Sequence, residues 1–152
     1  AFITRAPMRA VAMFLSLVAV RGQMSCRPTK GLNLTSALWG FDMHRVMGTI
    51  AETFITPRTQ EWLDKLLPDD DGSLCRVAVW ADQERPRMRW SAPMHYINTP
   101  DWQCNGFDQP RDCPVLCTDN AIQNYTHRAA NPSLPAFDRE KAIKFLVHFI
   151  GD

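Results

Sequence analysis

The chain has 152 residues, which is enough for one domain and not comfortably for two. Hydrophobic residues make up 45% of it and charged residues 22%, a composition that buries a core and is not that of a disordered chain. The formal net charge of +1 gives no sign of a polyanionic partner, so any inference about nucleic acid must come from a site.

The first segment, residues 1–38, is predicted to be a leader. Met8 and Arg9 precede an apolar run over residues 10–20, which is too short to span a bilayer and suits the core of a signal peptide. A short buried helix is the alternative. Residues 21–38 are polar and basic and look like a linker. We therefore predict a signal-peptide-like core at 8–20, a secreted protein, a domain over 39–152, and no transmembrane segment.

Helical periodicity begins after Trp39. Apolar residues recur at helical spacing up to Thr56-Pro57, and a second apolar face runs from Pro57 to the turn residues 68–72. Periodicity alone allows helix or strand over residues 74–82, and we favour a short helix.

The second half of the chain is less regular until its end. Residues 84–119 are rich in proline and predict a long ordered loop held by cysteines and ligands. Residues 121–127 predict a short helix, and 137–151 predict the clearest helix of the chain. The domain is therefore predicted to be mainly α. Because the last helical pattern runs to the final residue, Asp152, we expect the chain to be the N-terminal part of a longer domain.

Five cysteines are present, and three of them lie close together in the proline-rich stretch: Cys26, Cys75, Cys104, Cys113 and Cys117. Close cysteines in a loop favour a zinc knuckle or local disulfides, and no second close pair completes a four-cysteine metal site. Disulfides are the preferred interpretation for an exported chain. The sequons at Asn33 and Asn124 could then accept glycan.

Several separated residues could bind a cation. His148 and Asp152 stand four apart on the predicted last helix, so their side chains share one face. Each candidate also has an ordinary structural interpretation: His148 and Asp152 as a surface pair, His95 as a packed histidine, and Asp82 as a helix cap. The indole of Trp39 is not a usual ligand, whereas a free α-amino group there would be.

The combination of motifs is more specific than any one of them. In chain order they are Trp39-Gly40-x3-His44, Trp80-Ala81-Asp82, His95-Tyr96-Ile97-Asn98, Ala121-Ile122-x-Asn124-Tyr125-Thr126 and Phe145-Leu146-Val147-His148-Phe149-x-Gly151-Asp152. Over residues 39–152 the chain resembles the zinc-dependent single-strand nuclease and 3′-nucleotidase family. That family shares its α-helical fold with bacterial zinc phospholipases C. The resemblance implies an incomplete helical bundle of the phospholipase C/nuclease type, with long disulfide-held loops.

The resemblance also implies a set of metal ligands. A first zinc would be held by Asp82, His95, His148 and Asp152. A second would be held by His44 and by the amino and carbonyl groups of Trp39, with Asp152 bridging the two metals. A full family domain holds three zincs, and the ligands of the third lie beyond Asp152, so at most two sites are encoded here.

Further roles follow from the same resemblance. Asp82 would orient the attacking water, Arg85 would bind the scissile phosphate, and Tyr96 and Asn98 would stack on a base and hydrogen-bond its edge. Cys113 would pair with Cys117, Cys104 would pair beyond the chain, and no partner is assigned to Cys26 or Cys75.

The implied function is hydrolysis of single-stranded DNA and RNA to 5′-phosphate products, with 3′-nucleotidase activity, in a full-length protein that is a monomer. One alternative is a truncated, inactive zinc-binding remnant. Another is a phospholipase-C-like hydrolase, which Arg85 and Tyr96 disfavour mildly. We also expect a chain that stops at Asp152 to leave Phe145 and Phe149 without partners, an exposure that favours self-association.

Overall fold

The computed structural model describes residues 40–100 and 106–152. Across these two ranges the chain forms seven α-helices and two 3₁₀ helices and no strand, so the mainly α prediction is confirmed. Trp39, the leader 1–38, Cys26 and Cys104 lie outside the described residues. The elements are α2 (Phe41–Phe54), α3 (Pro57–Leu66), η1 (Pro68–Asp70), α4 (Leu74–Val77), α5 (Trp80–Glu84), η2 (Arg89–His95), α6 (Gln109–Asp112), α7 (Thr118–Ala130) and α8 (Ala136–Gly151).

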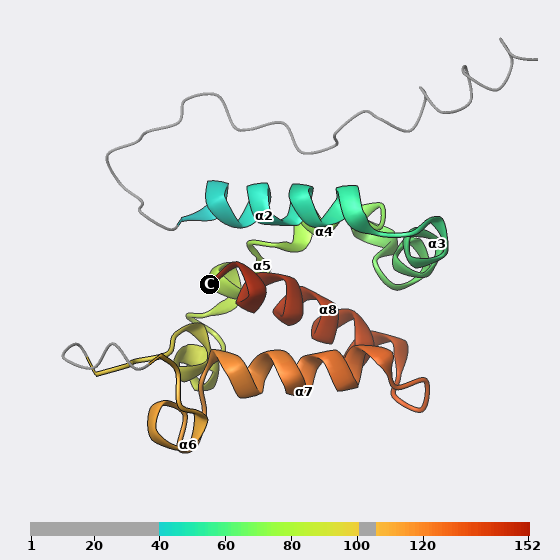
Figure 1. Ribbon diagram of the computed structural model, residues 1–152. Coiled ribbons are helices and arrows are strands. Elements are labelled where there is room, and N and C mark those ends of the chain that lie inside the picture. The colour runs from blue at the N-terminus through green and yellow to red at the C-terminus, as the bar shows by residue number, and fades with distance from the viewer. Residues whose placement is uncertain (1–39, 101–105) are drawn as a thin grey trace, which may run out of the picture.

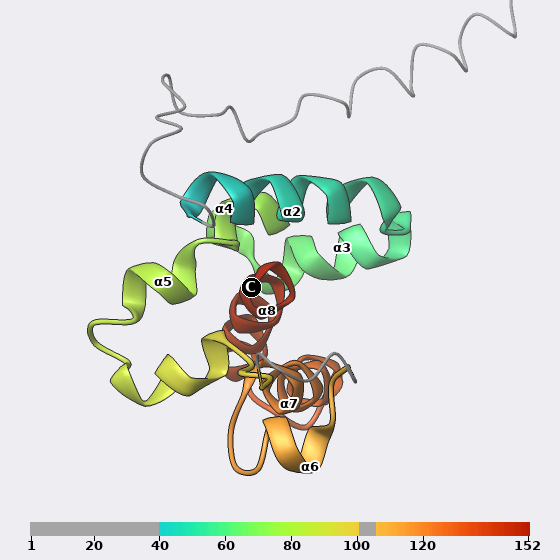
Figure 2. The same ribbon diagram turned by 60° about the vertical axis from the view of Figure 1, so that its left-hand side comes forward.

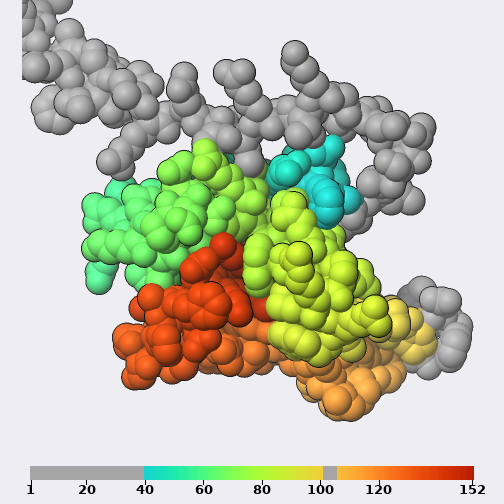
Figure 3. Space-filling view, turned by 180° about the vertical axis from the view of Figure 1, so that it is seen from behind, coloured from blue at the N-terminus to red at the C-terminus, as the bar shows by residue number. Residues whose placement is uncertain are grey.

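Helix α8 lies in the middle of the described structure. It forms an antiparallel pair with α7 on one side and faces α2, α3 and α4 on the other (Figures 1 and 2). Seen from behind, its residues lie between those of the first helices and those of α7, with α5 and η2 beside them (Figure 3). The C-terminal end of α8 thereby comes next to the N-terminal end of α2 (Figure 1). This meeting point is where the candidate site is found.

The aromatic residues of α8 form the centre of the core. Phe145 is 3% exposed and stacks on Tyr125 of α7 at a centroid separation of 4.7 Å, and Phe149 is 1% exposed. The expectation that these two rings lack partners is therefore wrong, because α7 supplies Tyr125 within the described residues. The exposed apolar side chains of α8 are Phe137 and Ile150 instead.

Local capping explains the ends of the first helices. Helix α2 ends at Phe54, and Thr56 starts α3 by accepting a hydrogen bond from the Thr59 amide on its side-chain oxygen at 3.1 Å. Pro57 occupies the first turn of α3, where the missing amide proton costs nothing. These bounds agree with the break predicted at Thr56-Pro57.

The middle of the chain differs from expectation in detail. Residues 74–82 are helical, but the helix is interrupted at Ala78 and Val79 and becomes α4 and α5. The stretch 84–119 is not a continuous loop, since it contains η2 and α6. The prolines of this stretch led to the loop prediction, but proline is tolerated in short helical turns. Pro93 lies inside η2, and Pro110 lies in the first turn of α6.

A disulfide joins Cys113 to Cys117 and closes the loop before α7. The backbone amide of Thr118, the first residue of α7, donates to the carbonyl of Tyr96 at 3.3 Å. The loop is thereby attached to the segment that follows His95.

An apolar cavity of about 200 Å³ lies between α2, α3 and α8. Its lining residues include Met47 and Ala51 of α2, Trp62 of α3, and Leu146 and Ile150 of α8.

No helix within residues 40–100 and 106–152 has the length and apolar character needed to cross a bilayer.

Candidate metal centre

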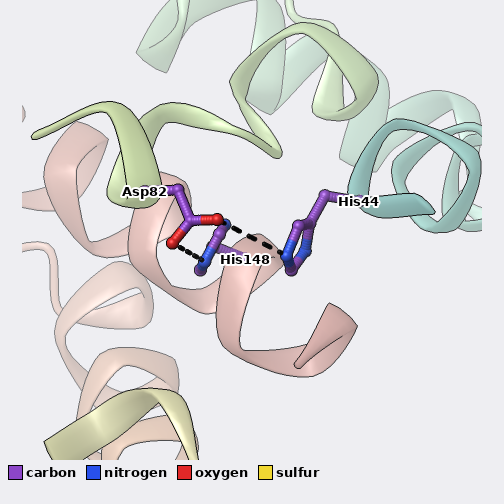
Figure 4. Close-up of side chains that lie close together, drawn as sticks. All are labelled: His44, Asp82 and His148. Carbon is purple, nitrogen blue, oxygen red and sulfur yellow. Dashed lines mark ion pairs between the residues drawn. The ribbon is translucent and has the colours of Figure 1, made fainter. Parts of the chain in front are cut away.

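Five of the predicted ligand residues lie together at the junction of α2 and α8. They come from separate elements: His44 from α2, Asp82 from α5, His95 from the end of η2, and His148 and Asp152 from the end of α8. We call these five residues the imidazole–carboxylate cluster. Figure 4 shows three of them, with the Asp82 carboxylate directed at the rings of His148 and His44.

The cluster contains two overlapping groups that could each hold a cation. In one, the ligand atoms of His44, Asp82 and His148 all lie within 4.8 Å of one another; in the other, those of His95, His148 and Asp152 do. This grouping by distance differs from the ligand sets that the resemblance implies. There, Asp82 binds the same zinc as His95, His148 and Asp152.

The two carboxylates each direct one oxygen to either side of the cluster. The Oδ2 atom of Asp152 lies 3.0 Å from His95 Nδ1 and 3.5 Å from His148 Nε2, and its Oδ1 lies 3.5 Å from His44 Nε2. The Oδ1 atom of Asp82 lies 3.8 Å from His95 Nδ1 and 3.5 Å from His148 Nε2. Its Oδ2 lies 4.0 Å from His44 Nε2.

The atoms therefore define two neighbouring binding positions. His95, His148 and one oxygen of each carboxylate surround the first, and His44 with the remaining oxygens faces the second. Both carboxylates are placed to bridge, and the distance from Asp152 to His44 is the shorter one. The resemblance implies Asp82, His95, His148 and Asp152 for the first zinc; that assignment stays a prediction, since the group whose ligand atoms all lie within 4.8 Å of one another contains His95, His148 and Asp152 without Asp82.

The cluster is largely withdrawn from water. The side chains of His44 and His148 are 1% and 0% exposed, that of His95 5%, and those of Asp152 and Asp82 12% and 26%. Burial lowers the pKa of His44, the neighbouring His148 lowers it further, and the carboxylates of Asp152 and Asp82 oppose the shift. The neutral imidazole, which is the form that binds metals, is thereby favoured at this position.

The hydrogen bonds of His148 leave a lone pair facing the cluster. Its Nδ1–H donates to the backbone carbonyl of Ala78 at 2.6 Å, so the neutral ring carries its lone pair on Nε2. The break between α4 and α5 places that carbonyl behind the ring. A carbonyl in this role is the usual outer partner of a zinc-bound histidine, because it fixes both the tautomer and the ring orientation.

The outer and inner ring nitrogens of the cluster have different surroundings. The buried nitrogens His44 Nδ1 and His95 Nε2 have no hydrogen bond within the described part of the chain. On the inner side, three ring nitrogens and four carboxylate oxygens converge, and His148 Nε2 lies 3.2 Å from His95 Nδ1. Imidazole nitrogen and carboxylate oxygen are the ligands that zinc takes in hydrolytic sites, so the residues fit this metal.

Glycine allows the two helix ends to approach. A Cβ atom on Gly151 would lie 2.6 Å from His44 Nδ1, closer than real atoms pack. Gly151 is therefore part of the reason that the His44 ring reaches Asp152. Sequence reasoning missed Gly151, which only its position beside Asp152 distinguishes. It also missed Ala78, because Ala78 acts through its backbone carbonyl and its residue type gives no signal.

The remaining predicted site residues surround the cluster without being part of it. Arg85 follows α5 and is exposed, as are Tyr96 (50%) and Asn98 beyond His95. Asn124 is exposed on α7. The amino group of Trp39 belongs to a residue outside the described ranges, one position before Gly40.

The fold and the cluster together define a helical protein with a candidate histidine–aspartate metal centre. Residues 39–152 match the S1/P1 nuclease family, and the chain belongs to that family. Nuclease P1 of Penicillium citrinum is 36% identical over 121 residues, which cover 75% of this chain and 44% of that protein. Endonuclease 4 of Arabidopsis thaliana is 35% identical over 128 residues, covering 75% and 42%. Nuclease S1 of Aspergillus oryzae is 37% identical over 120 residues, also covering 75% and 42%. The chain thus spans less than half the length of these curated relatives.

Proposed function

We propose that this chain supplies two zinc positions of a secreted nuclease that hydrolyses phosphodiester bonds in single-stranded DNA and RNA. The products would carry 5′-phosphates, and 3′-nucleotides would also be substrates. The observation that carries the proposal is the convergence of His44, His95 and His148 on the paired oxygens of Asp82 and Asp152. Because the chain belongs to a nuclease family, we interpret this cluster as a metal site for phosphodiester hydrolysis.

Two zinc ions are proposed, in the ligand arrangement that the resemblance implies. His95, His148, Asp82 and Asp152 would hold the first, and His44, Asp152 and the amino and carbonyl groups of Trp39 would hold the second. Bound zinc supplies a water that ionises near neutral pH and positive charge for the phosphoryl oxygens.

The chain's own residues would orient the reactants. Asp82 is the more exposed of the two carboxylates, so it can accept a hydrogen bond from the attacking water and direct its lone pair at phosphorus. The exposed guanidinium of Arg85, three residues further on, suits bidentate binding of a phosphate group.

Recognition of unpaired strands would rest on two exposed residues after His95. The Tyr96 ring is half exposed and its backbone carbonyl is fixed by the Thr118 amide, so the ring can offer a flat surface on which a base stacks. Asn98 would hydrogen-bond a base edge. Stacking accepts any base but needs it unpaired, which explains a preference for single strands.

Zinc content and cleavage, measured on the same protein, test this proposal. We expect elemental analysis to give two zincs per chain, and we expect release of 5′-phosphate ends from a single-stranded oligonucleotide. Asp152→Asn removes a charge that faces all three histidines, so it should abolish cleavage and lower the zinc content. His127→Ala is the matched control, because His127 is exposed on α7 outside the cluster.

The two measurements separate the alternatives. A protein without zinc would overturn the proposed metal centre. Two bound zincs without cleavage would overturn the nuclease proposal and support an inactive zinc-binding remnant. Cleavage of a phospholipid in place of the oligonucleotide would support the phospholipase-like alternative.

A further inference from the structure

A set of close contacts lies between α2 and α4, one and two helical turns along α2 from His44. Glu52 of α2 directs a single oxygen, Oε1, at α4, where it accepts hydrogen bonds from Ser73 Oγ at 2.8 Å and from the Cys75 amide at 3.0 Å. Ser73 is 8% exposed and also caps α4. One carboxylate oxygen thus attaches the start of α4 to α2.

Gly48 makes a second contact at the same place. A Cβ atom on Gly48 would lie 2.7 Å from Cys75 Cα and 2.8 Å from Cys75 N, so the backbones of α2 and α4 touch there. We call Gly48, Glu52, Ser73 and Cys75 the α2–α4 seam. Because the contact is backbone to backbone and is reinforced by the Glu52 hydrogen bonds, the relative position of the two helices has little freedom.

The α2–α4 seam connects the helix that carries His44 with the segment that positions His148. His44, Gly48 and Glu52 are spaced four residues apart and therefore share one face of α2. On the other side, α4 runs from Cys75 to its end at Val77, and the carbonyl of the next residue, Ala78, accepts a hydrogen bond from His148 Nδ1 at 2.6 Å. The rings of His44 and His148 are stacked with centroids 4.0 Å apart. A shift of α4 along α2 would move Ala78 and alter this stacking.

We propose that Glu52 is a positioning residue for the metal centre. It holds α4 on α2 and so places the Ala78 carbonyl that fixes the tautomer and direction of His148. This inference rests on the proposed function, since it assigns Glu52 a role in presenting His148 to zinc. The hydrogen bonds require an acceptor oxygen at Oε1 and make no use of the second carboxylate oxygen, so an amide can replace the carboxylate.

The test compares Glu52→Gln with Glu52→Met in the purified protein. Glutamine keeps the acceptor, and methionine keeps much of the volume but has none. For the metal-free protein, the tautomer of His148 is read from the 15N shifts of its ring. For the metal-loaded protein, zinc affinity is measured by competition with a chelator, and the visible spectrum is recorded with Co²⁺ in place of zinc.

We expect the native protein and Glu52→Gln to show the Nδ1–H tautomer and zinc affinities within about threefold of each other. In Glu52→Met the tautomers should be mixed, the Co²⁺ spectrum altered, and the zinc affinity about tenfold weaker, as for other outer partners of metal-bound histidine. Leu66→Ala is the control for general destabilisation, because Leu66 is a buried residue of α3, which supplies no ligand. It should lower the melting temperature and leave the other readouts unchanged.

The outcomes separate this inference from the proposed function. If Glu52→Met lowers the melting temperature but keeps the tautomer, the spectrum and the affinity, Glu52 is merely structural and the inference is overturned. If the native protein binds no zinc, the proposed function fails, while a tautomer change in Glu52→Met would still support the link from Glu52 to His148.

Discussion

The two ring nitrogens of His148 lie in different surroundings, and this difference defines the cluster. Nδ1 is saturated by the Ala78 carbonyl, whereas Nε2 faces Asp82 and Asp152 at 3.5 Å each. A neutral ring held this way presents the lone pair of Nε2 to a cation bound between the carboxylates. The ring of His148 is therefore oriented by the backbone carbonyl of Ala78 rather than by another side chain.

Gly151→Ala tests how closely the helix ends must approach. A methyl group would meet His44 Nδ1 at 2.6 Å, so the ring must move away from Asp152. We expect zinc affinity to fall about tenfold, the low end of the range for outer-partner changes. Titration calorimetry with zinc measures it, and Ile150→Ala, at an exposed neighbouring position, is the control. Unchanged zinc affinity in Gly151→Ala would contradict this prediction, because it would show that the His44 ring can move away from Gly151 without loss of zinc binding.

Acidification of the metal-free protein tests the environment of His44. Burial and the neighbouring His148 lower its pKa below the ordinary 6.5, so the unfolded chain binds more protons here just below pH 6.5 than the folded one does. The free energy of unfolding should therefore fall as the pH drops through 6.5. His44→Asn should flatten that slope in urea unfolding, whereas His127→Asn should not. An equal slope in all three proteins would refute the assignment.

At the scale of elements, α8 combines core packing with ligand presentation. Phe145 and Phe149 are buried against Tyr125 of α7, and Phe149 also meets the His95 ring edge-on at 5.0 Å. The face that carries His148 is thus anchored by the aromatic residues next to it. Packing of α8 on α7 fixes where the ligands at its end can lie.

Phe145→Ala should destabilise the protein by about 3–5 kcal/mol, because it removes a fully buried ring and leaves a cavity. Phe137→Ala on the same helix is the control, since Phe137 is 60% exposed and should change the free energy of unfolding by no more than about 0.5 kcal/mol. Urea unfolding measures both. Equal effects of the two changes would contradict the buried position of Phe145.

The sequence predicted helices well where the apolar spacing was regular. It predicted poorly where a local interruption of the backbone determined the course of the chain. The stripe in residues 137–151 located α8 within one residue, and Thr56-Pro57 located the end of α2. The interruption at Ala78 and Val79 has no compositional signal, and it is needed for the Ala78 carbonyl to meet His148. The partner of Phe145 could not be predicted either, because periodicity identifies an apolar face and not what covers it.

At the scale of the whole molecule, residues up to 108 positions apart in the sequence, His44 to Asp152, are brought within one cluster. The resemblance named all five of its described members from motif order, whereas spacing alone identified only the pair His148 and Asp152. Glu52 and Gly48 carry no motif of their own. Their importance follows from the close contact of α2 with α4, which exists only in three dimensions.

The exposed apolar surface of the molecule differs from the one expected. Its most exposed large residues include Phe54 (81%) of α2 and Ile150 (56%) of α8, and not Phe145 or Phe149. Ile150 also lines the apolar cavity. Self-association remains a prediction, which sedimentation velocity at increasing protein concentration would check. Phe54→Ser should reduce any such association, and an unchanged sedimentation profile would assign it to another surface.

The most direct test of the metal centre is diffraction from crystals grown with zinc, recorded on both sides of the zinc absorption edge. The proposal predicts an anomalous peak about 2.0–2.2 Å from His148 Nε2, His95 Nδ1 and an oxygen each of Asp82 and Asp152, and a second beside His44 Nε2. Zinc-loaded crystals with no anomalous peak among these five residues would contradict it.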